Sequence, residues 1–277
     1  MQSQELAHTF QHSALAPRIG TAVETDIGSL LSGDLSPAIR QLLEQRGVIA
    51  FPKIGLSDDQ QVAFTRTLGE IVEEGEGNIY KITMDPTENA QAEYLKGAFY
   101  WHIDGTMSDV PILASIMSAR RLSPVGGDTL FSNTYAAFDD LPRSEQEALE
   151  KLRVVHMFEV SQRFVTPEPR WETLKGWQQY QPRTLPLVWK HRSGRKSLVL
   201  GSTASHVEGM DLREGWALLT RLRDYATQDQ FVYRHTWNVG DMVIWDNTGT
   251  MHKAAAYPLD SGRMMHRTKL AGEESFA

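Results

Sequence analysis

The chain has 277 residues, with 28 basic and 35 acidic side chains and a formal net charge of −7 at pH 7. We expect one domain over residues 1–277, because a chain of this length can bury a single large core. It has no cysteine, which excludes disulfides, zinc–thiolate sites, iron–sulfur clusters and cysteine nucleophiles. The charge lacks the basic excess of a nucleic-acid binder. Neither a signal peptide nor an apolar spanning run is recognisable, so we expect a cytoplasmic protein without a membrane partner.

The first predicted elements are two helices around a short strand. Residues 36–47 carry proline in the first turn and glycine at the end, as helices do. Residues 48–51 are apolar, and a capping box opens a second helix over 57–68. The stretch 69–78 is acidic and rich in glycine, so we expect a loop there.

Beyond this loop the sequence is rich in short strands. Strands are predicted at 79–84, 112–120, 128–132, 153–159, 187–190, 196–200, 233–237, 242–246 and 263–270. Two helices interrupt them, at 133–152 and 211–227. This pattern predicts a mostly β protein with flanking helices, whose core is a double-stranded β-helix (a cupin-like jelly roll). The polar segment 161–184 is long enough to be an active-site lid.

His102 and Asp104 are candidates for a shared metal ion. On a strand, residues i and i+2 point to the same face, so both side chains could reach one ion. The pair by itself is weak, because a hydrogen-bonded histidine beside a surface aspartate has the same spacing. His252 follows a strand and a turn and could supply a third ligand. Two histidines and a carboxylate are typical of non-heme Fe(II) sites that activate oxygen, although Mn, Co, Ni and Zn accept the same donors.

Two arginines downstream of His252 are candidates for binding an anion. If residues 263–270 form a strand, Arg263 and Arg267 lie on one face. An inward-facing arginine is satisfied when its guanidinium fork binds a carboxylate. A solvated edge strand with exposed arginines is the alternative, and this segment alone does not decide between them.

Five features occur together in one order. They are the His102–Asp104 pair, the turn 126–129, the run 245–247, His252 and the ending 263–267. In this combination the chain resembles the taurine/dichlorophenoxyacetate dioxygenase family, from about residue 39 to the C-terminus. Enzymes of that family depend on Fe(II) and 2-oxoglutarate and consume O2.

The resemblance implies roles for individual residues. His102, Asp104 and His252 would ligate the iron. Arg263, helped by the hydroxyl of Thr129, would pair with the distal carboxylate of 2-oxoglutarate. The implied reaction is hydroxylation of a second substrate, with release of succinate and CO2, on the jelly-roll fold that the strand pattern already favours.

The resemblance also bears on the second substrate. Arg267 matches the family position that meets an anionic group, which implies a small anionic substrate, with a carboxylate on an apolar or aromatic body as our expectation. Hydroxylation beside an ether oxygen would cleave such a molecule. Tyr100 and His206 are further candidates for substrate contact. Alternation would place Tyr100 beside the metal pair, whereas a turn or capping role is the alternative for His206.

Two alternatives to this function stay open at the level of sequence. One is a family member that acts on a sulfonate such as taurine, although no histidine lies between His12 and His102 to hold the sulfonate as in taurine enzymes. The other is a non-catalytic metal-binding jelly-roll sensor. Relatives often form dimers or tetramers, so a homo-oligomer is also an expectation.

Overall fold

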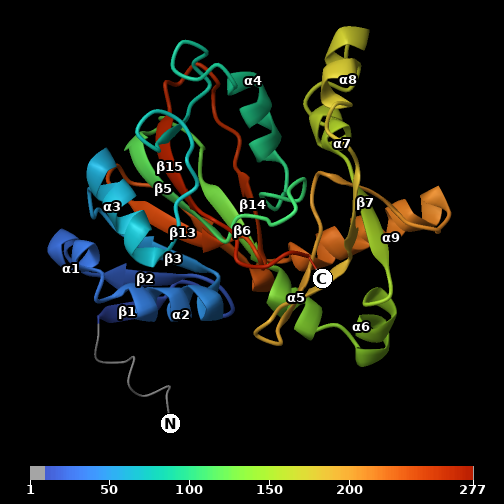
Figure 1. The fold of residues 1–277 in the computed structure, drawn as a ribbon, viewed down its shortest axis with the longest axis horizontal. Helices are drawn as coiled ribbons and strands as arrows, with labels where there is room; N and C mark the ends of the chain where they lie inside the picture. The colour runs from blue at the N-terminus through green and yellow to red at the C-terminus, as the bar shows by residue number, and fades with distance from the viewer. Residues whose placement is uncertain (1–9, 277) are drawn as a thin grey trace.

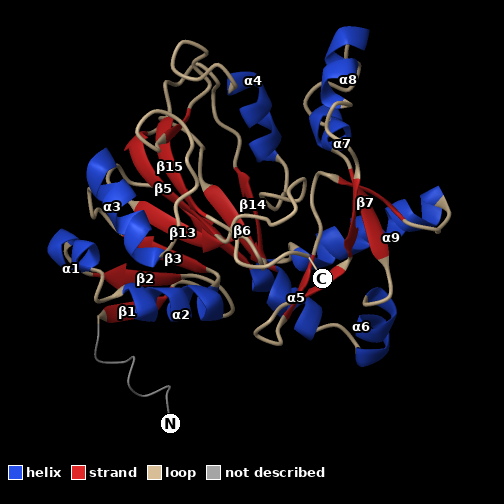
Figure 2. Cartoon of the chain, in the orientation of Figure 1, coloured by secondary structure: helices blue, strands red, loops and turns tan. Residues whose placement is uncertain are grey.

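The protein is described here by a computed structural model that covers residues 10–276. Within them the chain is mostly β with several helices (Figures 1 and 2). The strands are β1 (Gln11–Ala14), β2 (Thr21–Glu24), β3 (Val48–Phe51), β4 (Tyr80–Ile82), β5 (Ala114–Arg121), β6 (Thr129–Asn133), β7 (Arg153–His156), β8 (Arg183–Pro186), β9 (Val188–Lys190), β10 (Lys196–Leu198), β11 (Ala204–Val207), β12 (Val232–His235), β13 (Met242–Asp246), β14 (Thr250–Ala254) and β15 (Met264–Leu270). The helices are α1 (Ile27–Ser32), α2 (Ser36–Arg46), α3 (Asp58–Leu68), α4 (Ala92–Leu95), α5 (Thr134–Asp139), α6 (Arg143–Leu149), α7 (Phe158–Arg163), α8 (Trp171–Trp177) and α9 (Leu212–Ala226), with short 3-10 helices η3 (Lys96–Phe99) and η4 (Asp229–Phe231).

A seven-stranded sheet in the order β1-β2-β3-β13-β5-β15-β4 forms the main layer. Its pairs are antiparallel except β2 with β3. Central strand β13 is buried on both faces, because Met242 and Ile244 pack in one apolar cluster and Val243 and Trp245 in another. This alternation follows from the two-residue period of a strand.

Helices α1, α2 and α3 cover the outer face of the main sheet (Figure 1). The capping box of α3 is present: the Gln60 amide N–H donates to Ser57 Oγ, and the Ser57 amide N–H donates to Gln60 Oε1. The α3 side chains Phe64 and Leu68 are buried against this face. Burial of this apolar face stabilises the layer, at about 25 cal/mol for each Å² of apolar surface removed from water.

A three-stranded sheet, β12-β6-β14, faces the inner side of the main sheet. Phe131 of β6 is fully buried, and its ring centroid lies 5.5 Å from that of Trp245 on β13. The apolar cluster between the two sheets also holds Met117 and Met265. Residues of β6, β13, β14 and β15 that adjoin this cluster reach the cavity described below.

Most predicted elements occur near their expected places, and the structure adds short elements that the sequence did not predict. The helix expected over 133–152 is two helices, α5 and α6, because Pro142 cannot continue the first one. Strand β14, which carries His252, was not among the predicted strand ranges. The segment 161–184 is not a plain loop, since it contains the end of α7 and all of α8. No helix within residues 10–276 is long and apolar enough to cross a membrane.

Candidate metal centre and cosubstrate pocket

Backbone pairing brings the two candidate histidine ligands together. His102 and His252 form an isolated antiparallel bridge, in which each amide N–H donates to the other residue's carbonyl, at 3.1 and 2.9 Å. His252 lies in β14, which β6 holds in register by pairing His252 with Phe131. The expected strand around His102 is absent: η3 precedes it and only this one bridge forms. His102 and Asp104 nevertheless converge.

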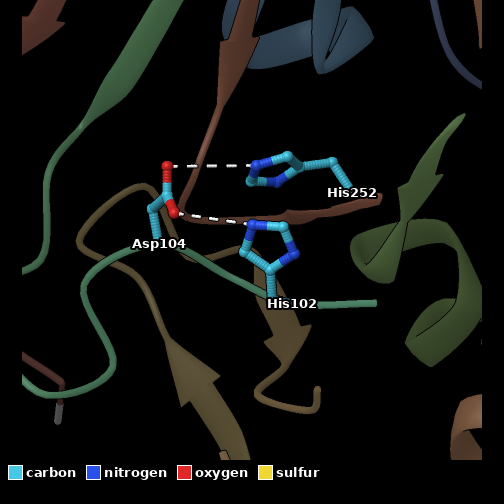
Figure 3. Close-up of side chains that lie close together, drawn as sticks. All are labelled: His102, Asp104 and His252. Atoms are coloured by element: carbon cyan, nitrogen blue, oxygen red, sulfur yellow. Dashed lines mark ion pairs between the residues drawn. The ribbon is translucent and has the colours of Figure 1, made fainter. Parts of the chain in front are cut away.

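The side chains of His102, Asp104 and His252 turn toward one another (Figure 3). One ligand atom from each lies within 4.8 Å of the others. The His102 Nε2 to Asp104 Oδ1 distance is 3.7 Å, and the His252 Nε2 to Asp104 Oδ2 distance is 3.9 Å. Both distances are too long for hydrogen bonds. They leave room for an ion, because two metal–ligand bonds together span at most about 4 Å.

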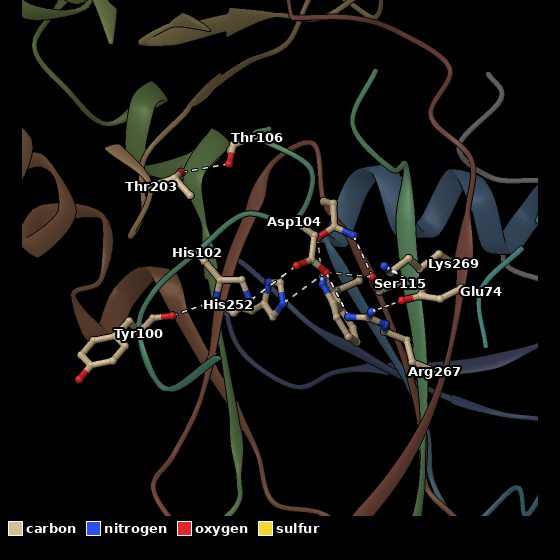
Figure 4. Close-up of polar contacts among 12 residues, drawn as sticks. Glu74, Tyr100, His102, Asp104, Thr106, Ser115, Thr203, His252, Arg267 and Lys269 are labelled. Carbon is tan, nitrogen blue, oxygen red and sulfur yellow. Dashed lines mark hydrogen bonds and ion pairs between the residues drawn. The ribbon is translucent and has the colours of Figure 1, made fainter. Parts of the chain in front are cut away.

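The tautomer of His102 suits a metal ligand. Its Nδ1 lies 2.8 Å from the carbonyl oxygen of Tyr100 (Figure 4). A carbonyl only accepts, so Nδ1 carries the hydrogen and Nε2 keeps its lone pair for the ion. In His252, Nε2 faces Asp104, whereas Nδ1 is buried with no hydrogen-bond partner among the described residues.

The charge states of the candidate ligands also fit a metal. Burial, together with the nearby His102, lowers the pKa of His252 to about 3, so the ring is neutral. Burial opposes ionisation of Asp104, but its electrostatic interactions with the two imidazoles and with the cations Arg267 and Lys269 outweigh burial and hold its pKa below the ordinary range. Neutral imidazoles and an ionised carboxylate are the forms that bind a divalent ion.

A chain of buried hydrogen bonds supports Asp104 from behind. The Ser115 hydroxyl donates to Asp104 Oδ2 at 3.4 Å, and the Asn247 side-chain amide donates to Ser115 Oγ at 3.2 Å. The Trp245 indole N–H then donates to Asn247 Oδ1 at 3.1 Å. Such outer partners orient a ligand and tune its basicity.

The candidate ligands open onto a cavity of about 430 Å³. It is also lined by three residues expected to bind anions, Thr129, Arg263 and Arg267. The bulge between Met264 and Met265 does not separate the two arginines, which both reach the cavity as the shared face predicted. Other walls come from Tyr94 of α4, Phe158 of α7 and Tyr180, all aromatic.

Arg263 is a buried cation without an acidic partner. Its residue exposure is 4%, and none of the ion pairs within residues 10–276 includes it. Its Nη2 donates to the Gly127 carbonyl at 3.2 Å, while Nε has no partner among those residues. Gly127 has a φ of +83°, and a Cβ there would lie 3.1 Å from Arg263 Nε, so this glycine makes room for the guanidinium. An unpaired buried cation is costly, which points to an anionic ligand at this end.

Thr129 completes this end of the cavity. Its Oγ1 accepts a hydrogen bond from the Trp237 indole N–H at 3.0 Å. Because a hydroxyl both accepts and donates, Thr129 keeps one donor for a carboxylate. Burial lowers the pKa of Arg263, yet a guanidinium stays charged at any physiological pH.

Arg267 differs from Arg263 because it has acidic partners. Its Nη2 lies 2.9 Å from Glu74 Oε1, and its Nη1 lies 3.7 Å from Asp104 Oδ2. The ring of Tyr80 lies beneath the guanidinium, 4.9 Å from its carbon. The sequence offered no signal for Glu74 beyond its place in an acidic loop, because a contact across 193 residues depends on the tertiary fold.

Two candidate substrate contacts lie away from the cavity. The Tyr100 hydroxyl donates to the Phe164 carbonyl at 2.8 Å, and its ring points away from the metal centre (Figure 4). The position predicted for Tyr100 by alternation was wrong, because residues 96–100 do not form a strand. His206 lies in β11, paired with β7, and its Nδ1 lies 3.1 Å from Ser205 Oγ. Neither residue lines the cavity.

Residues 11–269 match the family described as taurine catabolism dioxygenase TauD, TfdA family. The chain belongs to this family. A TauD/TfdA relative, the alpha-ketoglutarate-dependent 2,4-dichlorophenoxyacetate dioxygenase of Cupriavidus pinatubonensis, is 35% identical over 91% of this chain and 94% of its own. The (S)-phenoxypropionate/alpha-ketoglutarate-dioxygenase of Sphingobium herbicidovorans is 30% identical over 82% of each chain. The solved structure of AAD-2 with Mn(II) and N-oxalylglycine has a TM-score of 0.84 at 28% identity, over 97% of this chain and 99% of that one.

Membership in the TauD/TfdA family makes this protein a dioxygenase that depends on Fe(II), 2-oxoglutarate and O2. The relatives have names of catalytic enzymes, so a non-catalytic sensor is not favoured. The residues of the cavity fit both the metal ion and 2-oxoglutarate. Three convergent donors suit the ion, and a buried, unpaired arginine suits the dianionic cosubstrate.

Proposed function

We propose that this dioxygenase hydroxylates a small carboxylic acid with an aromatic body, with the chemistry directed by His102, Asp104 and His252 as iron ligands. The observation that carries the proposal is one cavity holding these three donors together with an unpaired buried arginine, Arg263. Bound iron with 2-oxoglutarate and O2 supplies the oxidant for a C–H bond, and succinate and CO2 are released.

The protein's own groups orient the cosubstrate. Arg263 offers its fork to the distal carboxylate of 2-oxoglutarate, and the Thr129 hydroxyl donates to the same group. A bidentate, charge-assisted pair of this kind both binds and aligns its ligand. The hydrogen bond from His102 Nδ1 to the Tyr100 carbonyl holds that ring's orientation, and Ser115 does the same for Asp104.

The substrate class follows from the other walls. Tyr94, Phe158 and Tyr180 offer aromatic surface, with the Phe158 and Tyr180 rings 4.5 Å apart. Arg267 would meet the acid group, as the family resemblance implies. Two relatives are named for phenoxy acids, and a phenoxy acid has this shape, with an ether oxygen next to the carbon that hydroxylation would attack. Hydroxylation there would release a phenol.

The same proposal extends to the core architecture, the domain, the lid, the cellular location and the oligomeric state. The seven-stranded and three-stranded sheets would form the double-stranded β-helix core of one domain over residues 1–277. Segment 161–184, with α8 and the end of α7, would be the lid, since Ser161 and Tyr180 line the cavity. We also propose a cytoplasmic protein that forms a homo-oligomer.

Succinate formation tests the function directly. Protein loaded with Fe(II) would be incubated with 2-oxoglutarate, O2 and a panel containing phenoxyacetate, both 2-phenoxypropionate enantiomers and taurine. We expect succinate and phenol in equal amounts from at least one phenoxy acid, and little from taurine. Asp104→Ala should abolish turnover and lower iron content, whereas Asp34→Ala, at an exposed position, should change neither. Normal turnover with normal iron in Asp104→Ala, or no succinate from any acid, would refute the proposal.

A further inference from the structure

Glu74 forms an ion pair with Arg267, the arginine that we propose meets the acid group of the substrate. We call this part of the cavity its substrate end. Glu74 Oε1 lies 2.9 Å from Arg267 Nη2, and Glu74 Oε2 lies 2.8 Å from Lys269 Nζ (Figure 4). The side chains of Glu74, Arg267 and Lys269 are 23%, 13% and 18% exposed.

Backbone contacts fix the position of Glu74 in its loop. On one side, the Val72 amide donates to the Lys269 carbonyl at 3.0 Å, which joins the loop to the end of β15. On the other side, Gly75 has a φ of +71° and packs so closely on the Ile79 carbonyl that a Cβ would collide with it. The backbone on both sides of Glu74 is therefore fixed, and it directs the carboxylate toward Arg267.

Both cations at this end already have an acidic partner in Glu74. The cations are Arg267 and Lys269, and the candidate metal ligand Asp104 also lies 3.7 Å from Arg267. An acid group that enters the cavity and approaches Arg267 must share the guanidinium with Glu74, and like charges this close repel. Glu74 itself does not line the cavity, so it acts on the substrate through Arg267.

We propose that Glu74 is a specificity-determining residue that weakens anion binding at Arg267. Its carboxylate lowers the affinity of the substrate end for acids, and most of all for dianions. The 2-oxoglutarate dianion and its product succinate are thereby directed to Arg263, which has no such partner. This inference rests on the proposed function, in which Arg267 meets the acid group of the substrate.

The substitution Glu74→Gln removes the negative charge of Glu74 with little change in the shape of the side chain. In Glu74→Gln, we expect the KM for the accepted phenoxy acid to fall by about threefold to tenfold, as for the loss of one partly buried charge. We expect kcat and the KM for the matching uncharged carboxamide to stay unchanged. Succinate should become a competitive inhibitor against the phenoxy acid, with an inhibition constant at least threefold lower than in the unchanged protein.

Glu73→Gln is the matched control, because it removes the same charge from an exposed position in the same loop. We expect it to change none of these constants. Glu74→Asp, which keeps the charge, should remain close to the unchanged protein and serves if Glu74→Gln folds poorly by circular dichroism. In an Arg267→Gln background, Glu74→Gln should no longer lower KM, since Glu74 acts through Arg267.

The opposite result would assign Glu74 a different role. If Glu74→Gln raises KM for the acid and the carboxamide alike, or lowers kcat, Glu74 only positions Arg267 and the inference is wrong. An unchanged KM for the acid would also overturn it while leaving the proposed function intact. If the unchanged protein oxidises no acid, the function fails separately, and calorimetric titration of phenoxyacetate and succinate into the metal-free variants decides the inference, with no tighter binding in Glu74→Gln contradicting it.

Discussion

The two ends of the cavity contain the same side chain in opposite electrostatic states. Arg263 is 4% exposed and has no acidic partner among residues 10–276, whereas Arg267 is paired with Glu74 and lies near Asp104. A buried cation without a partner costs free energy until an anion binds. A compensated cation gains less from a second anion. One cavity can therefore bind one acid strongly and another more weakly, without any difference in residue type.

Among the changes that test this difference between the two arginines, replacement of Arg263 should have the largest effect on KM. Arg263→Gln removes the proposed charge-assisted pair with 2-oxoglutarate, at a cost of about 2 to 3 kcal/mol, which corresponds to roughly a 30-fold to 150-fold rise in KM for the cosubstrate. The unliganded protein should not lose stability, because the change removes a buried charge that has no acidic partner. Steady-state kinetics and thermal unfolding, with and without 2-oxoglutarate, measure both effects. An unchanged KM would mean that the cosubstrate binds elsewhere.

Replacement of Arg267 should have a smaller kinetic effect and the opposite effect on stability. Arg267→Gln should raise the KM for the acid substrate by about tenfold, because a partly compensated charge contributes less. It also leaves Glu74 with Lys269 as its remaining partner, so the free energy of unfolding should fall by about 1 to 2 kcal/mol. Urea unfolding of both arginine variants tests the contrast. Equal losses of stability in the two would contradict it.

Thr129 tests whether the Arg263 end uses neutral donors as well as charge. Thr129→Val keeps the shape but removes the hydroxyl that accepts from Trp237. We expect a loss of about 1 kcal/mol, seen as roughly a fivefold rise in KM for the cosubstrate. The KM for the acid substrate serves as the internal control and should not change.

Ionic strength should produce the smallest effect. Screening acts more on partly exposed charges than on buried ones, so a rise from about 0.05 to about 0.5 M salt should raise the KM for the acid substrate by roughly twofold. The KM for the cosubstrate, which we propose that the more deeply buried Arg263 binds, should change less. A larger effect on the cosubstrate would reverse the assignment of the two ends.

Local sequence determined much of the fold. The capping box at Ser57 and Gln60 predicts the start of α3, and the apolar run 242–246 predicts β13, because both depend on neighbouring residues. Motif spacing likewise identified the candidate ligands, although the strand predicted around His102 and Asp104 did not match their true backbone. Their convergence depends on a bridge to His252, a residue 150 positions away.

Only the tertiary structure decided how each candidate is used. Sequence patterns predicted one shared face for Arg263 and Arg267 but could not distinguish their partners, because Glu74 reaches Arg267 across 193 residues through the register of a loop beside β15. The direction of Tyr100 was decided in the same way, by contact with Phe164. Charges and side-chain types are local properties of the chain. Which of them face each other depends on long-range packing, and here that packing makes one arginine free and the other paired.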